Sequence, residues 1–323
     1  AQIVWSRTRD EAGEVLSDPA YHRSLRRSGR QFGARYRYVE VGRDFRTQSG
    51  FVRRTDIREL SIFHRYAFRP EGKVLISWGP ELSFERLWDT SNLRLDDELE
   101  VGLEFELSGQ TELNVEYGYM RERLRPEDFD GLTENVDFKQ EGVSVRFESS
   151  FIEQLQLEGD VVLGVTPNFE PPDGALPHQA DFVEAEFELN VLPSTQLRID
   201  NSLLLFRLNE QNSSRKILSN RIVRSRWGWQ FDRRLSLRLI FQYDVTSADP
   251  LLTSEESSKN FNVDFLLTSL VNPWTALYIG TNSNYQNLAF NRSDPDNPLR
   301  RTGSDFLNDG RQFFVKFSYL LRY

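Results

Sequence analysis

Carboxylate side chains recur at every second position in several parts of the chain. Between residues 98 and 106 they alternate with apolar residues, as in the run Glu-Leu-Glu-Val. Because side chains alternate faces along a strand, such carboxylates share one face. A row of carboxylates along water attracts cations and filters polar solutes. The acidic residues expected on this face are Glu98, Glu100, Glu104, Glu106, Glu112, Glu116, Glu158, Asp160, Glu184, Glu186 and Glu188.

Arginines alternate in the same way near the start of the chain and again between residues 198 and 238. The basic residues expected on the same face are Arg35, Arg37, Arg65, Arg198, Arg224, Arg226 and Arg238. If the acidic and basic groups face each other across water, they create a transverse field that orients solutes. The same residues could instead pair with one another and fill a narrow interior, and the sequence leaves both readings open.

Other reactive residue types are sparse. The three histidines, His22, His64 and His178, have no metal-ligand spacing, and the chain has no cysteine. We therefore expect no metal site and no cofactor. A lipid-active enzyme would need a serine beside a histidine, but Arg65 and Tyr66 follow His64. We expect no enzymatic activity, and keep a lipid-active enzyme only as a third alternative.

The elements that carry these residues are alternating strands. Hydrophobic residues make up 38% of the 323 residues, and there is no apolar run of the roughly 20 residues that a membrane helix needs. Many alternating stretches suit membrane strands of about 9–11 residues. The net charge of −9 argues against a nucleic-acid partner. The fold class that we expect is all-β, an antiparallel transmembrane β-barrel of about 14 strands, in a range of about 12–16.

We expect a single domain spanning residues 1–323. Residues 1–56 are expected to be irregular, with one or two strands and a loop at 10–29, and residues 57–323 to form a regular meander. Tight turns and longer polar linkers alternate from residue 57 onward, as in barrels of the bacterial outer membrane. The expected loop at 10–29 breaks this alternation.

The C-terminal stretch is one strand with an oily face. Its aromatic and aliphatic residues alternate up to the final residue, and those expected to carry an assembly signal are Phe317, Tyr319, Leu321 and Tyr323. This stretch resembles the terminal strand that the barrel-assembly machinery reads in outer-membrane proteins. The resemblance implies two partners, that machinery and outer-membrane lipids, and a location in the bacterial outer membrane.

A second resemblance concerns the segment before residue 57. Its residues Phe45, Gly50, Phe51, Arg53, Arg54 and Asp56 resemble the Phe-Pro-Glu-Gly-Phe-Arg stretch of a bacterial family of unknown function. Members of that family carry an N-terminal domain similar to family-nine carbohydrate-binding modules, followed by a C-terminal outer-membrane barrel. The ending GRQFFVKFSYLLRY is also similar to theirs, whereas Thr47 and Gln48 stand where the family usually shows Pro and Glu. The resemblance covers most of this chain, as the barrel portion alone. We expect the segment to be a structural bend or an inward-tucked segment.

Together these patterns predict a pore or uptake channel for polar solutes. The carbohydrate link of the resembling family suggests saccharides among those solutes. The alternative is a non-conducting membrane anchor that displays a binding domain.

Overall fold

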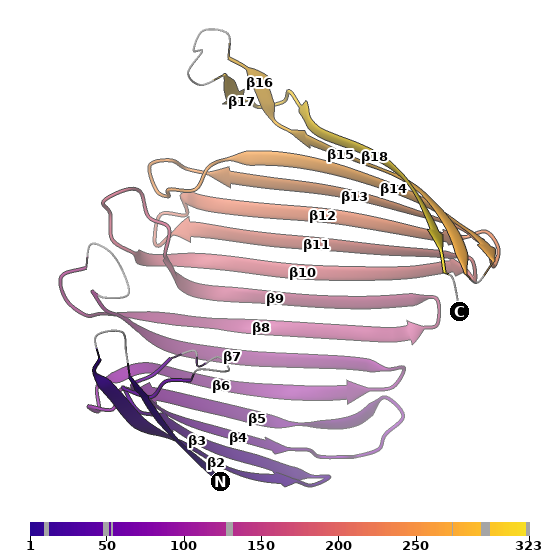
Figure 1. Ribbon diagram of the computed structural model, residues 1–323. Coiled ribbons are helices and arrows are strands. Elements are labelled where there is room, and N and C mark those ends of the chain that lie inside the picture. Colours follow the sequence, from indigo (N-terminus) through magenta and orange to yellow (C-terminus); the bar gives the residue numbers. More distant parts are fainter. Residues whose placement is uncertain are drawn as a thin grey trace. The chain divides into compact units, whose positions relative to one another are not determined.

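The computed structural model describes residues 1–9, 13–47, 52, 54–126, 132–272, 274–291 and 298–320. Sixteen strands form one antiparallel sheet whose order follows the chain from β1 to β15 and ends at β18 (Figure 1). Two short strands, β16 and β17, pair separately. The prediction of an all-β, antiparallel fold is confirmed. The sixteen strands of the main sheet stand at the upper limit of the predicted range.

The chain falls into two compact units. The first comprises Ala1–Ser108, Glu112–Val145 and Leu163–Pro167, and the second Gly109–Thr111, Arg146–Val162 and Asn168–Tyr323. The strands that lie entirely in the first unit are β1 (Gln2–Arg9), β2 (Val15–Ser28), β3 (Phe32–Val41), β4 (Ile57–Tyr66), β5 (Leu75–Trp88) and β6 (Arg94–Leu107). The strands divided between the units are β7 (Thr111–Leu124), β8 (Val136–Ile152) and β9 (Leu155–Asn168).

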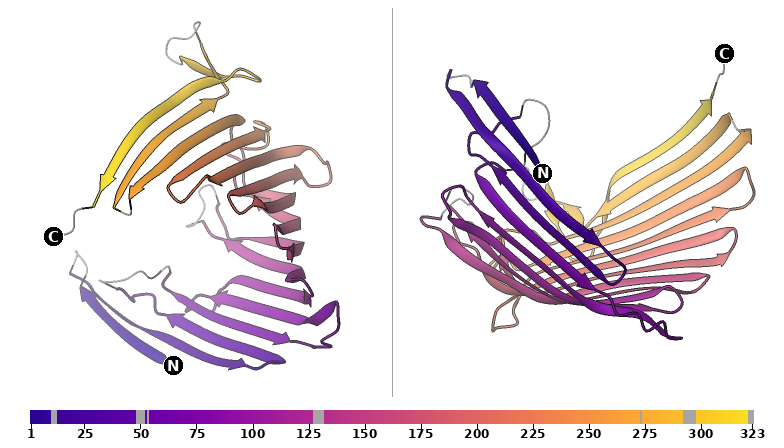
Figure 2. Two further views of the ribbon diagram at one scale, coloured as in Figure 1. Left: turned by 90° about the vertical axis from the view of Figure 1, so that its right-hand side faces the viewer. Right: turned by 90° about the horizontal axis from the view of Figure 1, so that it is seen from below.

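The second unit holds the remaining strands. These are β10 (His178–Ser194), β11 (Leu197–Glu210), β12 (Lys216–Gln230), β13 (Leu235–Ala248), β14 (Ser258–Asn272), β15 (Thr275–Gln286), β16 (Leu288–Phe290), β17 (Leu299–Arg301) and β18 (Leu307–Tyr319). Strands β10 to β15 run side by side with a common twist, as two further views show (Figure 2). The hairpin of β16 and β17 lies beyond the end of β15.

Residues 15–28 form strand β2, so the predicted loop at 10–29 is wrong for this part, and three strands precede residue 57. The alternation is hidden because Pro19 and several charged residues interrupt it on both faces. Backbone pairing fixes the strand instead, since the first part of β2, up to His22, pairs with β1, and its second part, from Ala20, pairs with β3. Pro19 lacks an N–H, and its carbonyl accepts a hydrogen bond from Gly42 at 3.0 Å.

Connections of two lengths alternate along the sheet. At one end of the strands the connections at residues 29–31, 108–110, 153–154, 195–196 and 231–234 are short, and residues 67–74, at the same end, are a longer exception. The long ones, at the opposite ends of the strands, include residues 42–56, 125–135, 169–177 and 249–257. With β2 counted as a strand, the alternation starts near the beginning of the chain, and the break expected there disappears.

Burial is unusually thin. In the described residues only thirteen apolar side chains are buried. Six of them form two small clusters, Leu124 with Leu132 and Phe138, and Ala180 with Leu208 and Ile217. Many large apolar side chains are instead exposed, including Phe313 and Phe317 at 68% and 66%. A soluble sheet normally covers its apolar face with a second layer, so this exposure needs another environment.

Candidate functional site

The first unit has one face that carries most of its acidic side chains. Register places Glu104 of β6 opposite Gly79 of β5, and Glu100 opposite Ser83. Glu116 of β7 lies on the same face. Its carboxylate is 3.6 Å from the position that a Cβ on Gly102 of β6 would occupy, and Gly102 lies between Glu100 and Glu104 on this face. We call this the first polar face. It carries the predicted residues Glu98, Glu100, Glu104, Glu106, Glu112 and Glu116, and Arg35, Arg37 and Arg65.

Arginine side chains on the first polar face lie between carboxylates and pair with them. The Arg65 guanidinium lies 4.0 Å from both Glu81 and Glu104. Glu106 accepts a hydrogen bond from the Ser77 hydroxyl at 2.7 Å and lies 3.8 Å from Arg69. Neighbouring strands of the first unit are therefore tied together by ion pairs.

The predicted separation of acidic and basic groups does not hold on this face. Arg37 pairs with Glu59 and lies 3.6 Å from Glu85, and Arg35 stacks over the Phe63 ring at 5.5 Å. Glu59, Glu81 and Glu85 were not among the predicted residues. Each of them alternates with apolar neighbours less regularly than the glutamates of β6, so only the strand register reveals the pairs.

The second unit shows the predicted separation. Glu184, Glu186 and Glu188 lie on β10, and register continues their face through β11 to Arg224 and Arg226 on β12. At about 4.8 Å between neighbouring strands, the acidic and basic rows are about 10 Å apart. Arg198 donates to Asp200 at 2.6 Å, and Arg238 lies opposite Gly228 on the same face. In the part of the chain that the structure describes, no carboxylate lies within 4.0 Å of Arg224, Arg226 or Arg238.

We call the face that carries these glutamates and arginines the second polar face. Toward β18 it becomes rich in amides. Asn220 donates to Asp244 at 3.1 Å and to Thr246 at 3.0 Å. Asn282 donates to Asp264, and Asn284 donates to Asp309 at 2.8 Å. Such a surface offers hydrogen bonds to uncharged polar molecules as well as to ions. The predicted residues Glu158 and Asp160 lie on β9, where Asp160 pairs with Arg146 at 2.9 Å.

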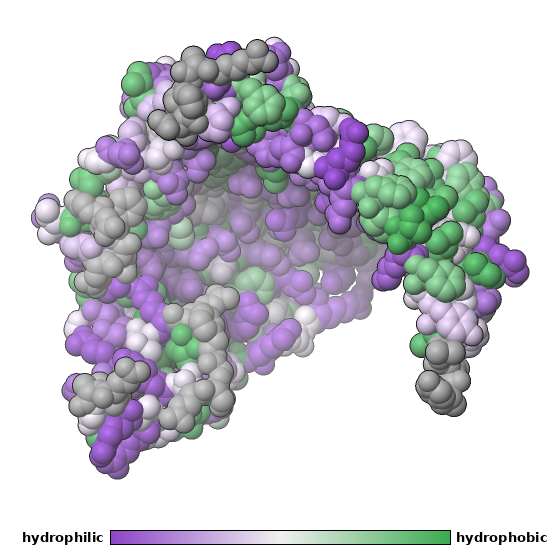
Figure 3. Space-filling model, turned by 45° about the horizontal axis from the view of Figure 1, so that its top comes forward, coloured by the Kyte–Doolittle hydropathy of each residue, from purple (hydrophilic) through white to green (hydrophobic). Residues whose placement is uncertain are grey.

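The opposite face of the second unit is an apolar band between two rows of rings. One row is Tyr243, Phe261 and Tyr285, paired across three strands with ring centroids 6.5 Å and 6.2 Å apart. Rings at the short-connection end include Trp229 and Phe231, stacked at 5.0 Å. In the space-filling view apolar side chains gather into one area on the right-hand side (Figure 3). On β14 the band runs from Phe261 to Val271, about 33 Å along the strand and about 25 Å after a strand tilt of about 40°.

The first unit has a matching apolar face. Rings of Tyr66, Phe68, Trp78 and Phe105 follow one another at 4.8, 4.8 and 6.4 Å near the short connections. Toward the long connections the same face becomes charged, with Arg86 bonded to Asp97 at 2.5 Å and Arg123 to Asp137 at 2.7 Å. The apolar stretch therefore ends before the strands do.

The connection after β3 packs against the first polar face. Phe45, in the connection after β3, is only 5% exposed. The flanking amides bond to the first polar face, Asp44 N to Asp18 at 2.8 Å and Arg46 N to Ser6 at 2.9 Å. Residues 44–46 are thus packed against the sheet, and the prediction of a bend or an inward-tucked segment stays a prediction for the rest of the motif. The motif residues Gly50, Phe51 and Arg53 lie outside the described residues.

Asp56 closes this connection. It accepts hydrogen bonds from the Thr90 hydroxyl and from Arg43, the latter at 3.1 Å. Burial alone would raise the pKa of Asp56, but the hydrogen bonds from Thr90 and Arg43 outweigh it and lower that pKa. Arg54, the other described residue at this end of the motif, is half-buried.

The remaining predicted residues are at the chain's end. Phe317 and Tyr319 lie on the apolar face of β18, exposed by 66% and 59%, while Leu321 and Tyr323 lie outside the described residues. His64 bonds to the Tyr36 hydroxyl at 2.7 Å. Among the described residues no cluster of side chains could hold a metal ion. In that same part of the chain no helix is long and apolar enough to cross a bilayer.

No family model matches the chain, and no curated protein matches it. Among solved structures the chain is similar to the FrpB iron transporter of Neisseria meningitidis (F3-3 variant), with 11% identity, a TM-score of 0.48, and coverage of 94% of this chain and 57% of that one. It is similar to the siderophore receptor PirA of Acinetobacter baumannii, with 10% identity, a TM-score of 0.48, and coverage of 98% and 58%. It is also similar to OmpT, an outer membrane protein of Vibrio cholerae, with 10% identity, a TM-score of 0.37, and coverage of 93% and 96%. The chain spans a little over half the length of the first two, and these distant likenesses carry no inference about function.

Proposed function

We propose that this chain forms the wall of a β-barrel in the bacterial outer membrane, with its polar faces toward an aqueous interior. The observation that carries the proposal is the apolar face of the second unit, which is exposed and bounded by aromatic rows about 25 Å apart. Large exposed apolar surfaces are rare on soluble monomers. Aromatic rows at both limits of an apolar band match the two interfaces of a bilayer.

Lipid also demands that the edges of the sheet be paired. Strands β1 and β18 stand at the two ends of the sheet order. Each backbone group without a partner in hydrocarbon costs several kcal/mol. Closing the sheet into a barrel supplies those partners, and an even strand number fits single-chain barrels of bacteria.

The barrel conducts polar solutes under this proposal. Carboxylates, arginines and amides along the polar faces bind ions and hydroxylated molecules weakly at many sites, as conduction requires. Saccharides suit the amide-rich part of the second polar face, and the family resemblance points the same way. Enzymatic activity is not expected, because His64 is bonded to Tyr36 rather than to a serine.

Single-channel recording of the purified protein in a planar bilayer tests the proposal. We expect stepwise conductance that is reduced in a dose-dependent way by added oligosaccharide. Conductance with no response to oligosaccharides would exclude saccharides as the solutes and would leave the channel function standing. Stable insertion without conductance would overturn the channel.

A non-conducting anchor is the second candidate. Ion pairs such as Arg65 with Glu81 and Glu104, and the inward-tucked residues around Phe45, could fill the interior of the first unit. Bilayer insertion without conductance would favour this function.

We also propose that the barrel-assembly machinery recognises the terminal strand β18. Its exposed, alternating aromatic side chains suit a strand that binds this machinery before its edge pairs with another strand. The chain's membership of the carbohydrate-linked family is likewise a proposal. It is supported by the buried Phe45 and the bonded Asp56 of the shared segment.

A further inference from the structure

The connection from β13 to β14, residues 249–257, does not project away from the sheet. Its Leu252 packs on the cluster of Ala180, Leu208 and Ile217, which β10, β11 and β12 contribute. Register shows that Leu208 shares the polar face with Phe182 and Leu218. The connection therefore covers an apolar patch on an otherwise polar face.

The middle of the connection is held by the residues that end and follow β9. Asn168 donates to the Leu252 carbonyl at 2.9 Å, and the Thr253 hydroxyl donates to the Glu170 carbonyl at 2.7 Å. Asn168 and Thr253 are only 3% and 2% exposed. Strand β13 is four steps from β9 in the sheet order, so the connection crosses about 19 Å of strand ends.

The near end is fixed as well. The Asp249 amide donates to the Ile217 carbonyl at 2.9 Å. Arg215 donates to the Asp249 carboxylate through two nitrogens, at 2.8 and 3.0 Å. The start and the middle of the connection are thus tied to segments of the chain that it does not join.

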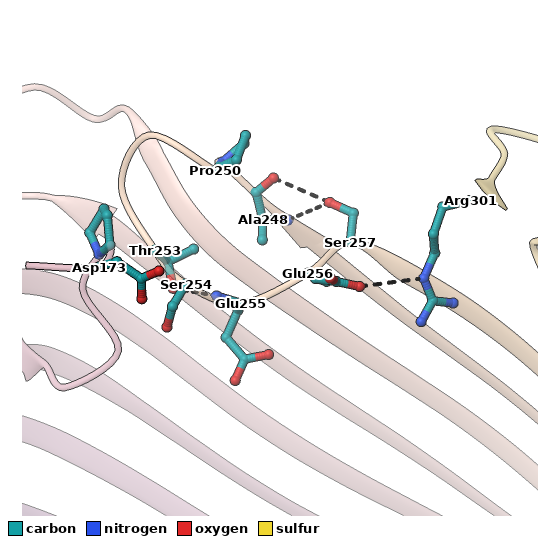
Figure 4. A pocket seen from close by; sticks show the side chains of 10 residues that line it. Asp173, Ala248, Pro250, Thr253, Ser254, Glu255, Glu256, Ser257 and Arg301 are labelled. Carbon is teal, nitrogen blue, oxygen red and sulfur yellow. Dashed lines mark hydrogen bonds and ion pairs between the residues drawn. The ribbon is translucent and has the colours of Figure 1, made fainter. Parts of the chain in front are cut away.

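The side chains that this fixed connection presents are acidic. An open pocket of about 740 Å³ lies beside it, lined by Asp173, Ser254, Glu255, Glu256 and Arg301 among others (Figure 4). Glu256 is 81% exposed and lies 3.9 Å from Arg301, at the limit of an ion pair. No basic side chain of the described residues pairs with Glu255.

We propose that residues 249–257 form a fixed acidic filter across the long-connection end of the second polar face, where Glu255 and Glu256 favour cations over anions. The proposal rests on the channel function proposed above. Two full carboxylate charges within a Debye length of a passing ion change its local concentration several-fold. Because the backbone is held at Thr253 before these two residues and at Ser257 after them, these charges keep their position without a bound ligand.

The first experiment measures the local potential without needing conductance. The chain has no cysteine, so Ser254→Cys introduces a unique thiol beside Glu255. We expect a cationic methanethiosulfonate reagent to react faster than an anionic one, and E255Q/E256Q to reduce the ratio of the two rates about five-fold. A matched thiol at Ser213→Cys, in the connection after β11, should keep its ratio. An unchanged ratio for the thiol at position 254 would overturn the filter.

The second experiment tests whether the connection is fixed. A Glu170→Cys and Ser254→Cys pair should oxidise to a disulfide without added catalyst, because the Ser254 amide already bonds to the Glu170 carbonyl at 3.1 Å. The pair Glu170→Cys and Ser213→Cys is the control. Failure of the first pair to cross-link would show that the connection is mobile and would overturn the proposal.

The third experiment separates this proposal from the proposed function. In a salt gradient, E255Q/E256Q should shift the reversal potential toward anion preference. Absence of any conductance in the unaltered protein would defeat the channel, whereas the thiol ratio would still report the filter. Conductance with an unshifted reversal potential would defeat the filter alone.

Discussion

At the scale of single residues, position along a strand decides what a substitution does. Leu239 and Ile240 are adjacent aliphatic residues on β13. Register places Leu239 between Trp227 and Phe265 on the apolar face, and Ile240 between Arg226 and Asp264 on the polar face. Hydropathy alone would assign both the same environment.

Leu239→Arg should therefore lower the free energy of unfolding by about 2–4 kcal/mol, because the charge faces hydrocarbon near the midplane. Ile240→Arg should cost much less, because the new guanidinium can pair with Asp264. Urea unfolding in lipid vesicles, followed by tryptophan fluorescence, compares the two variants. Equal losses would mean that the two faces are assigned wrongly.

Charge at single positions should also set ion preference. Changing Glu100, Glu104 and Glu116 to Gln should move the reversal potential toward anions, because the arginines then dominate the local potential. Changing Arg224 and Arg226 to Gln should move it the opposite way. If neither triple nor double variant differs from the parent in a salt gradient, these residues lie off the conduction path.

At the scale of elements, the strands from residue 57 onward could be predicted because each alternates clearly. Strand β2 could not, because partners on both sides fix its backbone while its side chains alternate poorly. The ion pairs of Arg37 and Arg65 were also hidden, since they depend on register between strands. The tucked connections depend on packing between segments far apart in sequence, as with Leu252 on Ala180.

The connection that ends at Asp56 should respond to acid. The pKa of Asp56 in the folded chain lies below the ordinary 3.8, so its hydrogen bonds stabilise the connection above pH 3.8 and are lost as pH falls through the folded pKa. The amide of Phe45, bonded to Gly42 at 3.2 Å, should be less protected from exchange at acid pH than at neutral pH, when each rate is divided by the intrinsic rate at that pH. In Asp56→Asn this protection should be low at both pH values. A neutral-pH rate in Asp56→Asn equal to that of the parent would remove Asp56 from this role.

Strand β18 should be needed for assembly. Deleting residues 319–323 removes Tyr319, which pairs with Thr275, and leaves backbone groups of β15 without partners in lipid. We expect loss of the heat-modifiable species on gels and accumulation in the periplasm. Lys316→Gln, on the polar face, should assemble normally. A truncated chain that folds without detergent would instead indicate a soluble sheet.

At the scale of the whole molecule, the aromatic rows set the depth of the protein in the bilayer. Among variants that keep one tryptophan, Trp229 should be quenched best by lipids brominated near the headgroup. With all native tryptophans replaced, Leu239→Trp should be quenched best by bromine deep in the acyl chains. The reverse order would contradict the placement of the apolar band.

The strands continue past that band. Beyond the ring pair of Tyr243 and Phe261, strands β13 and β14 stay paired for three more residues, about 8 Å of height after tilt. In the first unit, the strand ends near the long connections carry the ion pairs of Arg86 and Arg123. Connections such as residues 125–135 therefore start from a stiff rim that stands clear of the lipid surface. A peptide epitope inserted into such a connection would be held at a fixed height above the lipid surface, because a paired strand end supports it in place of a flexible linker. If the barrel that we propose has its long connections on the outside of the cell, these positions are the natural choice for surface display.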